Sequence, residues 1–257
     1  MSSDLIIPGG MRPPGYHFSV DDFFASLVNP PETGSAIADR PIFRFILDLA
    51  QSHGTITHLY VLLRDTKGSG SLHDLSDFTC KQLSEFGELR FGPHGQDYVS
   101  APHAQTLIEQ EKTFIDLYRA IGRFCQASRF SRWVRLHYFS ESYDLAPLFL
   151  ERGVSALLLT DKPIVTYRLD GLHKEALIEK GWTEKNGLAL IRSHLRFERC
   201  VAEGLSISEV CAHAANIVDR YGFVVLFTHE VDLANPRVRE MVRACIGSLA
   251  IAGVRSF

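Results

Sequence analysis

Two adjacent carboxylates, Asp21 and Asp22, follow a short apolar segment at residues 16–20 and precede Phe23. Such a pair suits one of two tasks. It begins a helix, because aspartate favours the N-cap and the first helical turn. Alternatively it performs chemistry, with one carboxylate binding a metal ion while its neighbour accepts a proton from a water molecule on that ion. Taken alone, the pair favours the helix start.

Further acids and imidazoles stand directly after other apolar segments of the chain. An ordinary role, as a buried ring bonded to a carbonyl or as a surface residue, is a frequent alternative for each histidine. A gathering of such side chains nevertheless suits a divalent metal or acid–base chemistry. The residues at these positions are Asp21, Asp22, Arg64, Asp65, His94, His137, Tyr138, Asp161, His229 and Glu230.

Strand-like and helix-like segments alternate along most of the chain, which favours a parallel sheet or barrel with crossover helices. In such folds the ligand site lies at the carboxyl ends of the strands. Segments 165–171 and 188–198 additionally predict a β-hairpin insertion. The predicted strands are 16–20, 55–63, 89–94, 133–139, 154–160 and 223–230, and the predicted helices are 43–54, 76–87, 103–125, 143–153, 207–222 and 236–253.

Composition indicates an ordinary globular protein, with 46% apolar and 22% charged residues and a net charge of −3 among 257 residues. This balance argues against a nucleic-acid or anionic-membrane partner. No repeat or linker divides the chain, so we expect a single domain over residues 1–257. The five cysteines are widely spaced and never form a C-x-x-C pair, which is typical of reduced cytoplasmic thiols rather than a zinc–thiolate site.

Targeting and cofactor motifs are also missing from the sequence. Its first residues carry no basic and apolar leader, and no apolar run approaches the roughly 20 residues that span a bilayer. We therefore expect a soluble, cytoplasmic protein with no membrane span. The chain has no G-x-G-x-x-G, P-loop, H-E-x-x-H or G-x-S-x-G pattern.

Four short segments together resemble, in order, the motifs of the polysaccharide deacetylase superfamily. They are FSVDDFF at 18–24, LRFGPHGQD at 89–97, VRLHYFS at 134–140 and VVLFTHE at 224–230. Members of that superfamily remove N- or O-acetyl groups on a distorted (β/α)7 barrel. The resemblance implies an α/β fold of this type and a metal-dependent hydrolase acting on an acetylated sugar. For a cytoplasmic enzyme, a nucleotide- or lipid-linked sugar precursor is the expected substrate.

The resemblance also implies a role for individual residues. A divalent ion, with zinc expected, would be bound by Asp22 and His94, with His103 as a third ligand. Asp21 is the expected general base, His229 the general acid, and Arg135 the residue that orients Asp21. The strand-end residues expected to contact substrate are His137, Tyr138, Asp161 and Glu230.

Two positions depart from the pattern of the superfamily. Tyr98 stands four residues after His94, where a second metal-binding histidine is usual, and Phe23 replaces a glycine after the aspartates. Either a loop returns His103 to the site, or the metal site has changed, or metal is absent. The rival hypotheses are a catalytically inactive barrel that binds carbohydrate or a partner protein, and a related hydrolase acting on a glycosidic or different amide bond.

Overall fold

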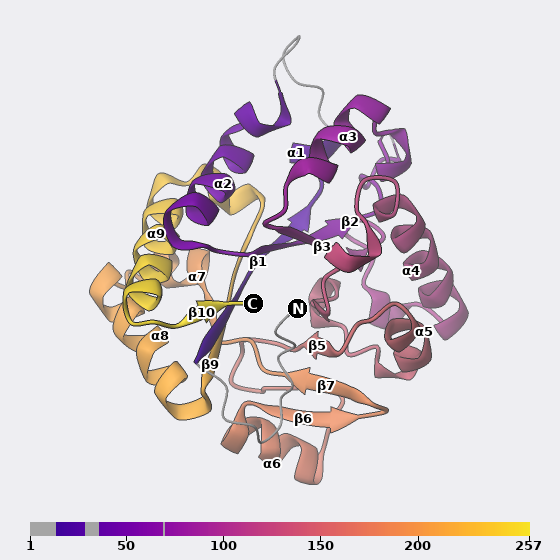
Figure 1. Ribbon diagram of the computed structural model, residues 1–257. Coiled ribbons are helices and arrows are strands. Elements are labelled where there is room, and N and C mark those ends of the chain that lie inside the picture. The colour runs from indigo at the N-terminus through magenta and orange to yellow at the C-terminus, as the bar shows by residue number, and fades with distance from the viewer. Residues whose placement is uncertain (1–13, 29–35, 69) are drawn as a thin grey trace.

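The computed structural model describes residues 14–28, 36–68 and 70–257 (Figure 1). Residues 1–13, which bear on the expectation about a leader, lie outside this part of the chain. The core of the fold is a set of mostly parallel strands, and the helices lie outside them (Figure 1). The structure is thus a mixed α/β fold, as the alternation of segments predicts. No helix in the described ranges is long and apolar enough to cross a membrane.

Main-chain hydrogen bonds arrange the strands in two sheets. The larger sheet has the order β3-β2-β1-β9-β8, with β10 also paired to β1, and all of its pairs are parallel. Its strands are β1 (Gly15–Phe23), β2 (Thr57–Leu62), β3 (Leu89–Gly95), β8 (Leu195–Arg196), β9 (Phe223–His229) and β10 (Arg255–Ser256). The smaller sheet has the order β4-β5-β7-β6 and contains β4 (Trp133–Val134), β5 (Ala156–Leu158), β6 (Trp182–Lys185) and β7 (Leu188–Ile191).

The two sheets are linked in two places. A parallel bridge joins Phe91 of β3 to Phe130, and the Ser131 N–H donates to the Phe91 carbonyl at 2.8 Å. Residues 192–194 carry the chain directly from β7 of the smaller sheet to β8 of the larger one. Gly92 lies at the first junction, where an added Cβ would come within 3.0 Å of Val134. A glycine therefore lets this segment approach Val134 without a shift of the neighbouring side chains.

The helices begin and end where the sequence provides caps. Ser206 and Glu209 form a capping box at the start of α8, and Gly54, with a φ of 64°, ends α2 in the left-handed conformation. The helices are α1 (Ala25–Val28), α2 (Pro41–His53), α3 (Asp77–Glu85), α4 (Leu107–Ile121), α5 (Ala146–Glu151), α6 (Gly171–Lys180), α7 (Phe197–Ala202), α8 (Ile207–Tyr221) and α9 (Pro236–Ile251). Six of these, α2, α3, α4, α5, α8 and α9, confirm predicted helices; five have shorter bounds, whereas α2 begins two residues earlier and ends one residue earlier than predicted.

The predicted hairpin is correct in one strand and wrong in the other. Residues 188–191 form β7, but their antiparallel partner is β6 and not segment 165–171, which leads into α6. Asn186 and Gly187, with φ values of 54° and 81°, make the two-residue turn between β6 and β7. An Asn-Gly pair favours this turn because both residues tolerate positive φ. The predicted strand 133–139 is also shorter, since β4 ends at Val134 and residues 137–139 form a 3₁₀ turn.

Buried neutral histidines give the core a pH-dependent stability. His58 bonds Ser131 Oγ at 2.7 Å and the Phe257 carbonyl at 2.9 Å, while His17 bonds the Tyr60 hydroxyl at 2.8 Å. Burial lowers the pKa of His58 to about 3 and holds the pKa of His17 well below its ordinary value. In the unfolded chain these rings take a proton near their ordinary pKa of about 6.5, so acid favours unfolding.

We expect the free energy of unfolding to fall as pH drops below about 6.5, by about 1.4 kcal/mol per pH unit for each such histidine. Urea unfolding of the wild type and of His58→Gln, measured across this range, tests the expectation. The variant should show a shallower dependence on pH, because it lacks one of the titrating groups. Equal slopes for the two proteins would contradict the assignment.

Candidate active site

Asp21 and Asp22 both belong to the end of β1, where successive side chains normally point to opposite faces. The register between β1 and β2 shifts between Val20 and Phe23, and Asp22 has a φ of 54°. Such a bulge turns a side chain away from the regular alternation, and aspartate is among the residues that tolerate the left-handed region. Both carboxylates consequently line one cavity of about 350 Å³.

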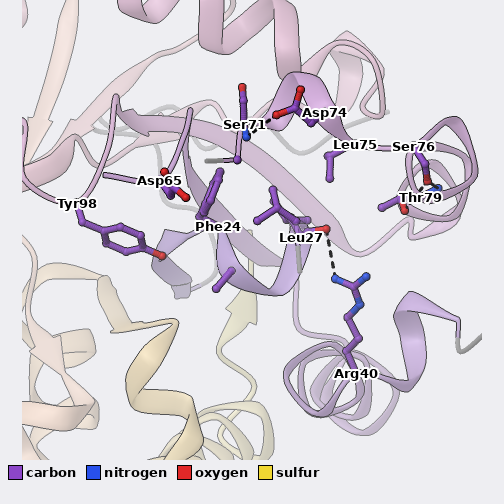
Figure 2. Close-up of a pocket in the computed structure, with 13 residues that line it drawn as sticks. Phe24, Leu27, Arg40, Asp65, Ser71, Asp74, Leu75, Ser76, Thr79 and Tyr98 are labelled. Carbon is purple, nitrogen blue, oxygen red and sulfur yellow. Dashed lines mark hydrogen bonds between the residues drawn. The ribbon is translucent and has the colours of Figure 1, made fainter. Parts of the chain in front are cut away.

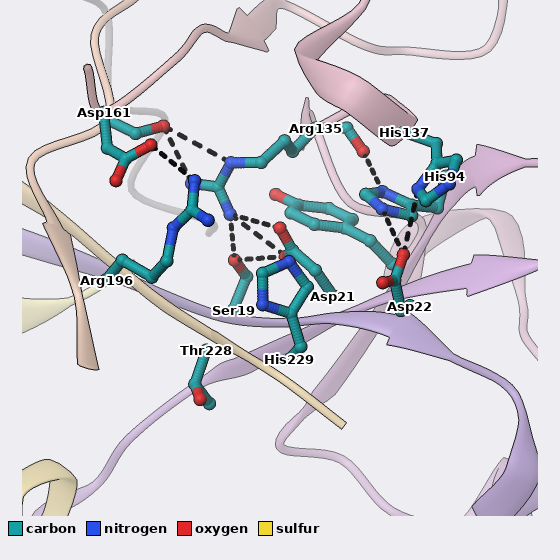
Figure 3. A network of polar contacts seen from close by, with 12 residues as sticks. Ser19, Asp21, Asp22, His94, Arg135, His137, Asp161, Arg196, Thr228 and His229 are labelled. Atoms are coloured by element: carbon teal, nitrogen blue, oxygen red, sulfur yellow. Dashed lines mark hydrogen bonds and ion pairs between the residues drawn. The ribbon is translucent and has the colours of Figure 1, made fainter. Parts of the chain in front are cut away.

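Three potential metal ligands meet at Asp22. Its Oδ1 lies 3.0 Å from His94 Nε2 and 3.0 Å from His137 Nδ1 (Figure 3). The three ligand atoms lie within 4.8 Å of one another, and both imidazoles are buried. Asp22 retains about a fifth of its side-chain exposure, so the group faces the cavity from its wall.

Backbone carbonyls determine which ring nitrogens carry hydrogen in these two histidines. His94 Nδ1 lies 2.6 Å from the Arg135 carbonyl, and His137 Nε2 lies 3.1 Å from the Tyr98 carbonyl. Because a carbonyl oxygen only accepts, each of these nitrogens donates its hydrogen to it. In a neutral imidazole the other nitrogen then carries a lone pair. Both lone pairs point at Asp22 Oδ1, an acceptor that is buried with no hydrogen-bond donor. This donor set fits a cation.

Irregular backbone brings each histidine to this point. In the pairing of β2 with β3, Pro93 and Gly95 face the consecutive residues Val61 and Leu62, so His94 is the extra residue of a bulge. An added Cβ at Gly95 would lie 3.0 Å from the Cβ of His137. Glycine is therefore needed next to His94 for the second imidazole to come close.

The Asp22 carboxyl is held in its charged form. Burial alone would raise its pKa. When no cation is bound and the rings of His137 and His94 are protonated, the hydrogen bonds that they donate outweigh burial and hold the pKa well below its usual range. A carboxylate that stays ionised is the form that binds a metal ion.

The Asp21 carboxylate forms a buried ion pair with Arg135. Arg135 Nη1 lies 2.9 and 3.0 Å from the two Asp21 oxygens, and both side chains are 1% exposed. Ser19 Oγ donates to Asp21 Oδ1 at 3.0 Å and accepts from Arg135 Nη1 at 2.8 Å, while Ser193 Oγ accepts from Arg135 Nη2 at 3.0 Å. The guanidinium also stacks 3.9 Å from the centre of the Phe227 ring. Asp21 is thereby fixed in orientation, as expected for Arg135.

His229 lies beside Asp21, because the two residues are register partners on β9 and β1. Its Nδ1 lies 2.6 Å from Glu198 Oε1, and Thr228 Oγ1 donates to the other oxygen of Glu198 at 2.9 Å. Burial would lower the pKa of His229, but the bond with Glu198 and the charges of Asp21, Glu198 and Asp22 raise it. His229 therefore favours the protonated form while it lines the cavity.

Three residues named from the sequence lie apart from the cation-binding group. His103 places Nδ1 3.0 Å from Ser140 Oγ and is not part of the Asp22–His94–His137 group. Asp161 pairs with Arg196 at 2.6 Å (Figure 3). Glu230 accepts the backbone N–H groups of Phe24 at 2.7 Å and Ala25 at 2.9 Å, as well as that of Ser26, so its carboxylate fixes the chain after β1.

Tyr138 lines the cavity with half of its surface exposed, as a substrate contact requires. His137, expected to contact substrate, lines the cavity and lies beside Asp22 and His94 as a potential metal ligand. Sequence reasoning missed the partners of the acidic and basic groups, Ser19, Ser193 and Glu198. Ser19 stands two residues before Asp21, the spacing that puts both on one face of a strand, and this signal was available.

A second cavity of about 670 Å³ lies beside the first, and Tyr98 lines both (Figure 2). The Tyr98 hydroxyl donates to the Asp22 carbonyl at 3.3 Å, so its ring stands next to the cation-binding group. Across the second cavity, Arg40 Nη1 donates to the carbonyls of Ser26 and Leu27. Tyr98 thus separates the two cavities.

Comparison with known proteins shows the fold and no closer relationship. No family model and no curated protein sequence matches the chain. The structure is similar to 4-α-glucanotransferase from Thermococcus litoralis, with a TM-score of 0.59 and 12% identity over 96% of this chain and 39% of that chain. This chain therefore spans well under half of that enzyme. The likeness shows a shared fold alone.

Two further solved structures match over most of both chains at lower similarity. One, from Bordetella bronchiseptica, carries a provisional assignment as a polysaccharide deacetylase involved in O-antigen biosynthesis, with a TM-score of 0.46 and 13% identity over 93% of this chain and 90% of that chain. The other is a polysaccharide deacetylase from Bacillus cereus, with a TM-score of 0.45 and 12% identity over 95% and 92%.

Removal of Arg135 should be strongly destabilising. Arg135→Ala leaves the buried Asp21 carboxylate without its cation, which typically costs about 3–5 kcal/mol of unfolding free energy. Arg237→Ala breaks an exposed pair with Glu240 and should cost less than about 1 kcal/mol. Urea denaturation measures both. The double variant Asp21→Leu/Arg135→Met should recover part of the loss, and a single variant as stable as the Arg237 control would refute the buried pair.

Proposed function

We propose that this protein is a divergent, metal-dependent deacetylase that removes an acetyl group from a sugar or sugar precursor. The proposal assigns Asp22, His94 and His137 as the metal ligands, with His137 in place of the His103 expected from the sequence. It includes a single domain over residues 1–257 in which the two sheets form a distorted (β/α)7 barrel. Zinc is the proposed metal, because one carboxylate and two imidazoles suit it.

The observation that carries the proposal is the direction of the two imidazole lone pairs. Both aim at one carboxylate oxygen that has no donor, and both rings are fixed by carbonyls on their far side. Metal-binding histidines characteristically have their second nitrogen held in this way. Without a cation, the arrangement requires protonated rings buried against Asp22, so metal content distinguishes the two states.

The catalytic roles follow from position and charge. A bound divalent cation would polarise the acetyl carbonyl and activate a water molecule. Asp21, held by Arg135 and Ser19, accepts the proton from the attacking water as general base. His229, kept protonated by Glu198, donates a proton to the leaving group from the neighbouring strand. Arg135 acts as a positioning residue because its guanidinium holds Asp21.

The character of the cavity supports a carbohydrate substrate. Its lining includes the aromatic side chains of Tyr98, Tyr138 and Tyr167 together with Lys162. Aromatic faces and hydroxyls suit a sugar ring, and a lysine suits the phosphate of a nucleotide- or lipid-linked sugar. We therefore retain such a precursor as the proposed substrate, in a cytoplasmic setting.

The alternative is an inactive barrel that binds carbohydrate or a partner protein. Its main support in the sequence was Tyr98 at the position of a metal-binding histidine. In the structure the Tyr98 carbonyl bonds His137, and His137 supplies a second imidazole beside Asp22 and His94. Tyr98 in place of a histidine is therefore compatible with a set of three metal ligands. We favour an active deacetylase over an inactive barrel.

The first test is metal content. We expect purified protein supplied with zinc to hold close to one ion per chain by plasma mass spectrometry. Substitutions Asp22→Asn, His94→Gln and His137→Gln should each lower zinc affinity strongly, because each removes a ligand. His103→Gln is the matched control and should keep full zinc content. Loss of zinc in the His103 variant, with retention in the His137 variant, would overturn the assignment.

The second test concerns His229 and its carboxylate partner. His229→Gln should keep zinc but lose about 10²–10⁴-fold in acetate release from acetylated amino sugars, including nucleotide-linked ones. The pKa of His229 is raised, so the acid form persists upward in pH and activity falls as pH rises through that pKa. Glu198→Gln removes the charge that stabilises the imidazolium, and should move this fall to lower pH. A pH–rate profile unchanged in Glu198→Gln would contradict the assignment.

A further inference from the structure

A small cavity of about 230 Å³ lies apart from the two cavities beside Tyr98, between α8 and the segment that joins β7 to β8. It shares no described lining residue with either of them. None of the described residues that line it is acidic. Its polar lining residues are Arg192, His194, His213, Asn216, Arg220 and Tyr221. Positive charge and hydrogen-bond donors are therefore concentrated in one small space.

Neither arginine of this cavity has a carboxylate partner in the described part of the chain. Arg220 stands four residues after Asn216 and seven after His213, so the three share one face of α8. Its Nη2 donates to the Ile178 carbonyl at 3.2 Å. The Arg192 guanidinium makes neither a hydrogen bond nor an ion pair with a described residue. Two cations without a counterion favour the entry of an anion.

The His194 ring adds a buried donor that has no acceptor. The Val225 N–H donates to His194 Nδ1 at 2.9 Å, so in the neutral ring Nδ1 carries the lone pair and Nε2 carries the hydrogen. Nε2 is buried and has no hydrogen-bond partner among the described residues. The ring stacks on Tyr221, with ring centres 5.4 Å apart, which fixes its orientation. A buried N–H left unpaired costs free energy, and an acceptor that enters the cavity would remove this cost.

We propose that this cavity is a binding site for a phosphoryl group, carried by inorganic phosphate or by a small phosphate monoester. The guanidinium groups of Arg192 and Arg220 match the double negative charge of such a ligand, and arginine is well suited to phosphate oxygens. The His194 N–H and the Asn216 amide would supply further donors. The cavity is smaller than the roughly 300–1,000 Å³ of sites for drug-sized ligands, which argues against a whole nucleotide.

The histidine takes part as a neutral donor. Burial, together with the positive charges of Arg192, His213 and Arg135, lowers the pKa of His194 to about 3. The ring is therefore uncharged at neutral pH, and its bond to Val225 keeps the hydrogen on Nε2. The two arginines supply the charge that the ligand requires.

The site adjoins the residue that supports Arg135. Arg192 and His194 flank Ser193, whose Oγ accepts from Arg135 Nη2 at 3.0 Å. A ligand held by both flanking residues would immobilise this segment without contacting the proposed substrate. Because such a ligand binds the folded chain and not the unfolded one, it should raise the melting temperature as its concentration increases. The proposal is independent of the deacetylase assignment, since no lining residue of this cavity takes part in that reaction.

The experiment titrates the full-length, zinc-supplied protein by calorimetry with inorganic phosphate and, separately, with glycerol 3-phosphate. Chloride keeps the ionic strength constant. Arg192→Gln and Arg220→Gln should each weaken binding at least about tenfold, because each removes a charge-assisted hydrogen bond. His194→Asn keeps an acceptor for the Val225 N–H but removes the Nε2 donor, so it should weaken binding as well. Tighter binding of the ester supports a phosphate monoester as the ligand, and tighter binding of phosphate supports the free ion.

Three control variants distinguish this site from the active-site cavity and from general loss of charge. Arg237→Gln removes an exposed charge outside the cavity, whereas Lys162→Gln and Asp22→Asn alter only the active-site cavity. All three should bind phosphate as wild type does, and all variants should fold by circular dichroism. The proposal would be overturned by the absence of binding to either phosphate probe or by equal affinities in Arg192→Gln and Arg237→Gln. Loss of binding confined to Lys162→Gln or Asp22→Asn, or tighter binding of acetate than of phosphate, would also overturn it.

Discussion

The rest of the site depends on one buried residue, Arg135. Its guanidinium pairs with Asp21 and reaches Ser19 and Ser193, so it ties β1 to the segment that joins β7 and β8. Its backbone carbonyl separately holds the Nδ1–H of His94 and turns the other nitrogen of that ring toward Asp22. Arg135, which directly follows β4, thus fixes the Asp21 carboxylate with its side chain and the His94 imidazole with its main-chain carbonyl. Removing an arginine from water costs free energy. The ion pair with Asp21 and the main-chain hydrogen bond to His94 offset this cost at Arg135.

Irregularities at the ends of β1 and β3 allow the side chains of Asp21, Asp22 and His94 to converge on one cavity. A regular β1 would send Asp21 and Asp22 to opposite faces, and a regular β3 would not offer His94 as an extra residue. The register shifts at both strand ends remove this restriction, and the small Gly95 leaves room for His137. Bulges of this kind are common next to active sites because they re-aim a side chain without disturbing the core.

Much of the fold and part of the site could be predicted from the sequence. The alternation of segments predicts the α/β class. Of the ten residues that the rule of strand ends selects, six line a single cavity, namely Asp21, Asp22, His94, His137, Tyr138 and His229, and Arg64, Asp65, Asp161 and Glu230 are not among its lining residues. Glu198 was missed because segment 188–198 was interpreted as one side of a hairpin, although its second half contains β8 and ends at a strand terminus. The Asn186–Gly187 turn would have placed that hairpin correctly. His137 could not be assigned as a ligand, since its approach to Asp22 depends on backbone contacts between distant segments.

Tyr98 stands where the superfamily pattern has a histidine. The positions of potential ligands in the folded structure are therefore a better guide to a metal site than their spacing in the sequence. Two histidines one helical turn apart reach a single ion through local geometry. Here the second imidazole comes from the chain after β4, and Tyr98 supplies the carbonyl that orients it. One carboxylate and two imidazoles meet at Asp22, which is the donor set that the proposed metal site requires, although the sequence pattern differs. For the proposed chemistry the donor atoms and their directions are what a cation requires, so the altered motif argues for relocation of a ligand and not for its loss.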